Sequence, residues 1–439
     1  AACGGGGDSG SGTTVTPVTT AAPTDAQAAR FLAQGSLAAT DAEIATVKSN
    51  GYAAWIEAQF AAPTSQSHWD WLVANGFADV ANRNNQAGFN NTVWRKLMTS
   101  PDPLRQRIVL ALSEIFVVSI AGLTVSWRQF VSAAYLDTLE ANCFGNFRTL
   151  LEAVTLSIGM GSYLNMRGNQ KEDPATGRLP DENYAREILQ LFTIGLYELN
   201  DDGTPRVAGG KPVETYDQST ITGLARVFTG WNYVTTGPAL TVAPDRSRQP
   251  MQHFPALFSA GDKTFLGATI SGAADGPTAL GQALDIIFNH HNVGPFIGKQ
   301  LIQRLVTSNP SAAYVGRVTA AFNNTNGVRG DMKAVIRAIL TDSEARDDTQ
   351  VDSASFGKLR EPVVRFVQWA RAFNVTSPTN LWPFGNTASS ANRLAEAMGR
   401  APSVFNWFRP GYTPPGTTVA TKGLVAPEFQ IANEPSVIA

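Results

Sequence analysis

Hydrophobic positions recur every three to four residues along most of the chain, which is the period of an amphipathic α-helix. The strongest case is residues 104–119, which are apolar on nearly all sides and are therefore predicted to form a buried, central helix. Thr40 and Glu43 match a capping-box pattern, so a helix is expected to begin there and to stop at Gly51. Further helices are predicted at residues 127–140, 147–159, 218–231, 278–288, 292–306, 314–322, 331–341 and 358–373.

Three stretches lack this period. Residues 160–179 form a long polar loop, residues 232–277 favour a few short strands, and residues 401–431 are rich in Pro, Gly and aromatic residues. No fixed repeat is present. The pattern predicts a mainly α protein: a single large helical domain over residues 25–439, with long irregular loops and a few short strands.

Residues 1–24 are rich in Gly, Ser, Thr, Ala and Pro and are predicted to be a flexible tether, because they contain too few large apolar groups to fold. Cys3, preceded by two Ala residues, resembles the processing site of a bacterial lipoprotein signal. We expect a lipid on Cys3 to be the only contact with the membrane. The residue after Cys3 is Gly4 and not Asp. By the same resemblance, this favours attachment to the outer membrane, on its periplasmic side or at the cell surface.

The densest group of polar side chains lies in residues 180–195, for which one helix is predicted, with Pro180 and Asp181 in its first turn and a stop at Gly195. Helical spacing places the following residues on one face: Glu182, Asn183, Arg186, Glu187, Gln190 and Thr193. One interpretation is a solvated surface with a Glu182–Arg186 pair. Because only 16% of the chain is charged, the other is a covered face, and we expect Glu182, Arg186 and Glu187 to be substantially buried.

The run P-D-E-N-Y-A-R-E-I-L-Q-L-F-T-I-G at residues 180–195 resembles the signature of a bacterial family called domain of unknown function 1800. Matching stretches follow in the same order at residues 224–231, 262–267 and 403–408, with Pro410. The resemblance covers about residues 28–431, and Asp181 stands where the signature usually has Asn. It names no reaction. Members of this family look to be encoded often beside members of a second uncharacterised family, domain of unknown function 1501, so the resemblance implies a protein of that family as a partner.

Several chemistries find no support in the sequence. The four histidines show no H-x-H or H-E-x-x-H spacing, which argues against a zinc hydrolase, and His290 and His291 are predicted to cap or pack a helix. No G-x-S-x-G, phosphate-binding loop or dinucleotide fingerprint occurs. The net charge of −2 does not support nucleic-acid binding. Cys143 is predicted to be a buried free thiol.

Residues 200–204 are predicted to form a tight turn at Asp202-Gly203. The oxygens of Asp201 and Asp202 leave Ca²⁺ as a weak alternative, but a full calcium loop would end in a Glu that is missing. We expect no other metal or cofactor.

Carboxylate chemistry is what remains. Glu182 and Glu187 are the candidate catalytic residues, with Asp181 and Arg186 as partners. The two glutamates diverge by about 140° around a helix, so a second carboxylate from the loop or from Asp262 would be needed for glycoside cleavage. The candidate binding residues are Asn183, Gln190, Arg226, Trp231, Asp262 and Lys263.

Two functions follow from these residues. The first is a protein without catalytic activity that binds an extracellular polymer or an envelope protein. The alternative is a glycoside hydrolase-like hydrolase or lyase that acts on an extracellular polysaccharide through Glu182 and Glu187.

Overall fold

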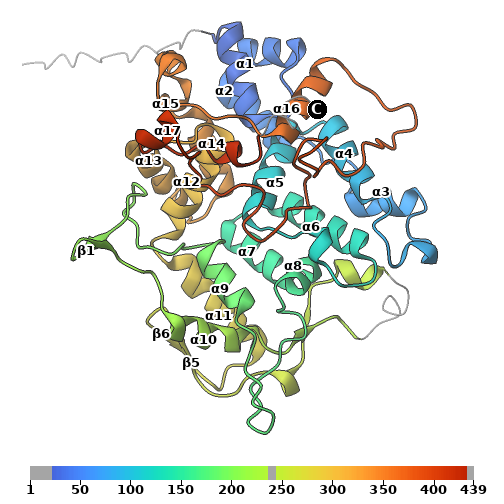
Figure 1. Ribbon diagram of the computed structural model, residues 1–439, viewed down its shortest axis with the longest axis vertical. Coiled ribbons are helices and arrows are strands. Elements are labelled where there is room, and N and C mark those ends of the chain that lie inside the picture. The colour runs from blue at the N-terminus through green and yellow to red at the C-terminus, as the bar shows by residue number, and fades with distance from the viewer. Residues whose placement is uncertain (1–21, 236–243, 433–439) are drawn as a thin grey trace, which may run out of the picture.

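The computed structural model describes residues 22–235 and 244–432. Within them lie 17 α-helices and three two-stranded antiparallel ribbons, which confirms the mainly α fold class (Figure 1). No helix in these two ranges is long and apolar enough to cross a membrane. Cys3 and nearly all of the predicted tether lie outside the described residues.

The α-helices, in chain order, are α1 (Asp25–Gly35), α2 (Asp41–Ala61), α3 (His68–Ala74), α4 (Phe89–Thr99), α5 (Pro103–Ile115), α6 (Arg128–Asn142), α7 (Phe147–Leu156), α8 (Ile158–Tyr163), α9 (Asn183–Gln190), α10 (Gln218–Ala225), α11 (Gly276–Asn289), α12 (Val293–Leu305), α13 (Ala312–Asn323), α14 (Met332–Thr341), α15 (Ser343–Arg346), α16 (Pro362–Ala372) and α17 (Thr418–Thr421). The strands are β1 (Val207–Ala208) with β2 (Lys211–Pro212), β3 (Trp231–Asn232) with β4 (Gln252–His253), and β5 (Lys263–Phe265) with β6 (Ala268–Ile270).

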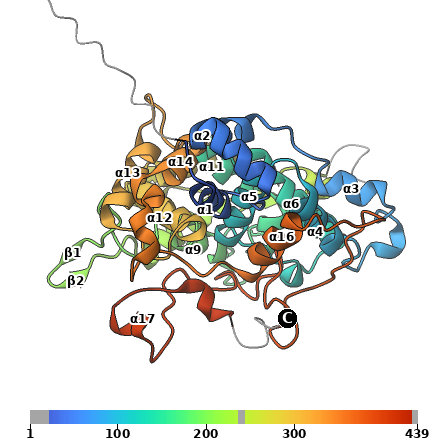
Figure 2. The same cartoon turned by 90° about the horizontal axis from the view of Figure 1, so that it is seen from above.

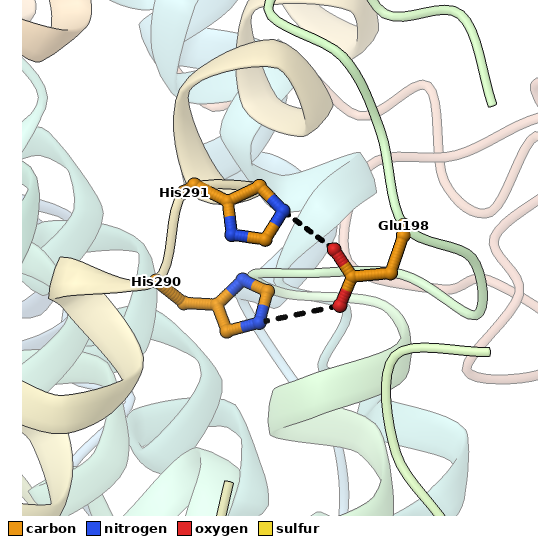
Figure 3. A group of neighbouring side chains, drawn as sticks. All are labelled: Glu198, His290 and His291. Carbon is orange, nitrogen blue, oxygen red and sulfur yellow. Dashed lines mark ion pairs between the residues drawn. The ribbon is translucent and has the colours of Figure 1, made fainter. Parts of the chain in front are cut away.

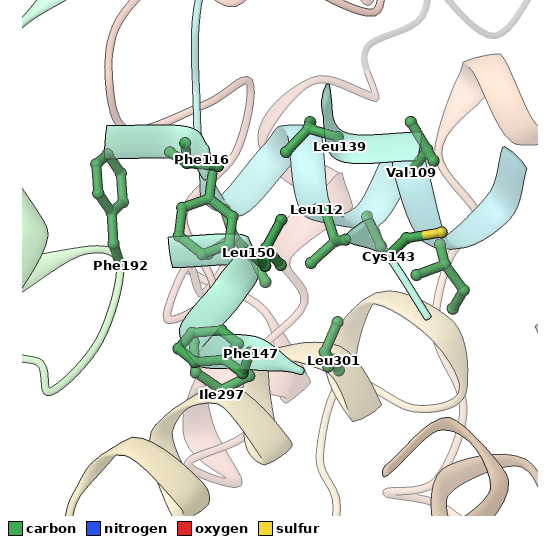
Figure 4. Close-up of a cluster of buried hydrophobic side chains, with 14 of the residues drawn as sticks. Val109, Leu112, Phe116, Leu139, Cys143, Phe147, Leu150, Phe192, Ile297 and Leu301 are labelled. Atoms are coloured by element: carbon green, nitrogen blue, oxygen red, sulfur yellow. The ribbon is translucent and has the colours of Figure 1, made fainter. Parts of the chain in front are cut away.

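Helix α5 is the centre of the core, as its apolar pattern predicts. Phe116, which directly follows α5, packs against Phe147 of α7 and against Phe192 (Figure 4). One large cluster of buried side chains continues from there through α6, α12 and α14. The helix ends at Ile115 rather than at residue 119, and Cys143 is a buried free thiol as predicted.

Local sequence signals account for most helix ends. Thr40 and Glu43 form the predicted capping box at the start of α2. Gly51 has φ 80°, but the helix resumes after it, so the predicted stop is a kink. The predicted helix at 358–373 begins only at Pro362, because proline, which lacks an N–H, suits the first helical turn. The predicted helix at 147–159 divides at Ser157, whose hydroxyl caps α8.

The non-helical stretches match the prediction in part, because α8 extends to Tyr163 and covers the start of the loop predicted at residues 160–179. Strands β3 to β6 fall within or beside residues 232–277, and the C-terminal coil with α17 runs along one side of the helical body (Figure 2). This coil returns residues 403–411 to the neighbourhood of α12, where they line a pocket.

Candidate functional site

The signature helix α9 is shorter than predicted. It begins at Asn183, with Glu182 at the N-cap, so Pro180 and Asp181 precede the helix instead of forming its first turn. The Asp181 carboxylate accepts the backbone N–H of Asn183 at 2.8 Å. The loop before the helix contacts Asp181 through the side chains of Asn165 and Asn169. The loop therefore holds the residue that precedes the helix.

The polar face of α9 is only partly covered, by α10. Glu182 accepts hydrogen bonds from Gln218 at 2.7 Å and Thr222 at 2.8 Å, and Arg186 lies 3.4 Å from the same carboxylate. The side chains of Glu182 and Arg186 are 30% and 40% exposed, so the prediction that they are buried is wrong. Glu187 is 7% exposed, as predicted, and burial raises the pKa of its carboxyl group.

Two of the predicted binding residues, Arg226 and Lys263, form hydrogen bonds to the loop at residues 259–262. Arg226 donates to Ser259 at 2.9 Å and to the carbonyl of Asp262 at 2.8 Å, and it pairs with Glu172 at 3.3 Å. Lys263 is fully buried and donates to a backbone carbonyl. Every described contact of these side chains holds neighbouring segments in place.

Two predicted residues have other surroundings. Trp231 is buried in β3 and packs against the ring of His253. Asp202 accepts the N–H and the hydroxyl of Thr204, and Gly203 has φ 74°, which confirms the predicted turn.

A pocket of about 690 Å³ brings two of the motif stretches together. The end of the signature helix and the turn after it supply Gln190, Leu191 and Gly195, and the C-terminal motif supplies Val404, Phe405 and Pro410. Gln190 also accepts the hydroxyl of Tyr216 at 3.3 Å. Residues conspicuous in sequence and far apart along the chain thus line one cavity.

Comparison with known protein families identifies the chain as a whole. The family model described as "Protein of unknown function (DUF1800)" matches residues 30–438. The chain belongs to this family. No curated protein matches the chain, and no solved structure does.

The pocket of this DUF1800 chain has apolar walls and a cationic rim. Leu196, Tyr197 and Phe405 line it and are exposed. Lys299 and Arg409 also line it, and the Arg409 guanidinium lies 4.9 Å from the centre of the Phe405 ring. Burial lowers the pKa of Lys299. Such a surface suits a ligand that is apolar along its length and carries negative charge.

The floor of the DUF1800 pocket is a buried network of charged side chains. Glu114 lines the pocket and lies 3.2 Å from Arg304. Behind them, Glu361 pairs with Arg107 at 3.0 Å, and a third pair completes the network, Lys358–Glu428 at 2.9 Å. With Glu396, the network holds four carboxyl groups and three cations.

Protonation of carboxyl groups offsets the excess of carboxyl groups over cations in this network. Burial, and then the neighbouring Glu361, raise the pKa of Glu396 to about 8 and the pKa of Glu114 well above its usual range. Burial is the largest single influence on Glu361 and raises its pKa, but the combined effect of Arg107, Lys358, Glu114 and Arg304 lowers it. Glu396 is therefore mainly protonated at neutral pH, and its Oε2 accepts the N–H of Val363 at 2.9 Å.

Sequence reasoning missed the residues of this floor. They come from separate segments, so no local motif contains them. One signal was available: Glu114 lies within the stretch predicted to be a buried helix, and a buried carboxylate requires a partner.

Proposed function

We propose that this DUF1800 chain is an extracytoplasmic, lipid-anchored binding protein. Its pocket binds an extended, apolar and acidic segment of a partner protein at the cell envelope. The observation that carries the proposal is that two motif stretches meet at a cavity with apolar walls and the cations Lys299 and Arg409.

The composition of the pocket favours a protein partner over a polysaccharide. Exposed large apolar side chains that lie close together mark association sites, and aromatic and Arg residues are enriched at the centres of protein interfaces. Tyr197, Phe405 and Arg409 supply that combination. A protein of the 1501 family is the partner implied by the resemblance.

Site-specific photocrosslinking tests this proposal. A photoreactive phenylalanine analogue at position 405 is expected to yield one discrete, protease-sensitive adduct in the native envelope. Arg409→Ala should weaken this crosslink about tenfold, which corresponds to about 1.4 kcal/mol. The control carries the analogue at Phe373, which is 69% exposed on the turn after α16 and does not line the pocket. Equal crosslinking from both positions would contradict the proposal.

A carboxylate-dependent hydrolase or lyase of the glycoside hydrolase type is the second candidate. The observation in its favour is Glu187, a buried carboxyl group with a raised pKa, because a general acid must hold its proton near neutral pH. Turnover of a polysaccharide by the wild type, lost in Glu187→Gln without a change in melting temperature, would favour this candidate over the binding protein.

The proposal that the protein is anchored to the membrane by a lipid rests on the sequence of residues 1–24. Cys3 follows two Ala residues and precedes a stretch rich in Gly, Ser and Thr. We expect Cys3→Ser, expressed with the native signal, to move the protein from the outer-membrane fraction to the soluble envelope fraction. Cys143→Ser is the control, because Cys143 is buried in the core. Unchanged fractionation of Cys3→Ser would contradict lipid attachment.

A further inference from the structure

Three groups of His, Asp and Glu side chains in the described residues lie close enough to share an ion. Two of them already contain a Lys or Arg side chain of the protein as a counter-charge. Glu114, Glu361 and Glu396 belong to the network with Arg107 and Arg304, and in the group of His68, Asp137 and Glu140 the Lys96 ammonium lies 2.7 Å from Glu140. The third group is Glu198, His290 and His291. In the part of the chain that the structure describes, no Lys or Arg side chain forms an ion pair with Glu198.

The third group has the donor set of a zinc site. The Nε2 atoms of His290 and His291 lie 3.8 Å and 2.5 Å from the two Glu198 carboxylate oxygens (Figure 3). The two imidazole rings are stacked, with centroids 4.5 Å apart. Two imidazole nitrogens with one carboxylate oxygen are a common set of protein ligands for Zn²⁺.

The contact between Glu198 and His291 is close but is not a hydrogen bond. Glu198 Oε2 and His291 Nε2 are both buried atoms without a hydrogen-bond partner. Ligands bound tetrahedrally at about 2.0–2.1 Å are separated from one another by about 3.3 Å. The three donor atoms lie within 4.8 Å of one another, so modest side-chain rotations bring them to that spacing.

A buried asparagine holds the two segments in register. Asn292 follows the histidines directly and is fully buried. Its side chain donates to the carbonyls of Ile194 and Tyr197 at 2.8 Å and accepts the N–H of Leu199 at 2.9 Å. These bonds fix the backbone on both sides of Glu198 against the α11–α12 junction, so the donor atoms are brought together without an ion.

An acidic pocket of about 510 Å³ gives access to the group. Glu198 and His290 line it together with Glu214 and Asp217. Side chains of one sign at a cleft raise the local concentration of the opposite ion.

We infer that Glu198, His290 and His291 form a binding site for a divalent transition-metal cation of the zinc class. Three protein ligands leave a fourth coordination position open toward the pocket. Binding through Nε2 places the remaining ring proton of His290 on Nδ1. The 3.2 Å contact that Nδ1 accepts from the Asn292 N–H is then lost, while the side-chain bonds of Asn292 remain.

Equilibrium dialysis of the chelator-treated, full-length protein against Zn²⁺ tests the site. Wild type is expected to bind one Zn²⁺ per chain, and Co²⁺ in its place should give the visible absorption of a tetrahedral site. His291→Asn and Glu198→Gln should each weaken binding by at least about a hundredfold. The melting temperature should rise with Zn²⁺ in wild type and stay unchanged in both variants.

The matched control is Glu152→Gln, since Glu152 is a half-exposed carboxylate paired with Arg148 and distant in sequence from the site. It should bind Zn²⁺ like the wild type. His291 is 40% exposed, so His291→Asn should fold even if Glu198→Gln does not. Wild-type affinity and stoichiometry in His291→Asn, or no stoichiometric Zn²⁺ in wild type, would overturn the inference. Neither outcome affects the crosslinking test at Phe405.

Discussion

Replacing Gly223 with Ala is expected to lower the free energy of unfolding by about 3 kcal/mol or more. Gly223 lies in α10, and a Cβ atom there would be 1.9 Å from the backbone carbonyl oxygen of Thr264 in β5. A backbone oxygen cannot move aside like a side chain, so α10 and the β5–β6 ribbon must separate. Urea denaturation monitored by circular dichroism measures the loss.

Gly281→Ala is the matched control. Gly281 lies in α11, and a Cβ atom there would meet no atom within 4 Å. Since Ala is the better helix former, this variant should be more stable than wild type by about 0.5–1 kcal/mol. Equal effects of the two substitutions would show that α10 does not pack on β5 as described.

Glu396→Gln is expected to make the protein more stable than wild type at pH 8, with a difference that shrinks as pH falls and disappears below about pH 4.5. The folded-state pKa of Glu396 is raised from 4.5 to about 8. Between these values the folded chain binds a proton that the unfolded chain has released, so wild-type stability falls as pH rises. Gln is neutral at every pH and can still accept the N–H of Val363.

Each unit of the raised pKa corresponds to about 1.4 kcal/mol, so the difference at pH 8 should reach a few kcal/mol. Chemical denaturation at several pH values measures it. Glu152→Gln should change stability by about 1 kcal/mol or less at every pH, because its pair with Arg148 is at the surface. Parallel pH profiles of Glu396→Gln and wild type would contradict the protonated state of Glu396.

Local patterns in the sequence were sufficient for most of the long helices, although not for α3 and α4. The apolar run around Leu112 predicts a central helix because side chains that are apolar on all sides must be buried on all sides. Thr40 and Glu43 predict a helix start because their side chains satisfy backbone N–H groups within one turn. In both cases the pattern that supports the prediction lies within one short segment of the chain.

Local patterns did not predict which side chains on the polar face of α9 are buried. Glu182, Arg186 and Glu187 lie within six positions, and helical spacing puts them on one side. Gln218 and Thr222 of α10 contact Glu182 but leave Glu182 and Arg186 part-exposed, whereas Glu187 is buried. Charge density in a sequence cannot report which neighbouring element covers a face.

The sequence by itself determined the family, the mainly helical class and most helix starts of this protein. Only the tertiary structure decided the two sites. Glu198 lies beside His290 and His291 because Asn292 binds the backbone on both sides of Glu198. Gln190 and Phe405 line one pocket because the C-terminal coil returns to α12. Helix periodicity depends on contacts three or four residues apart, whereas these sites depend on how separate segments pack, which no local pattern encodes.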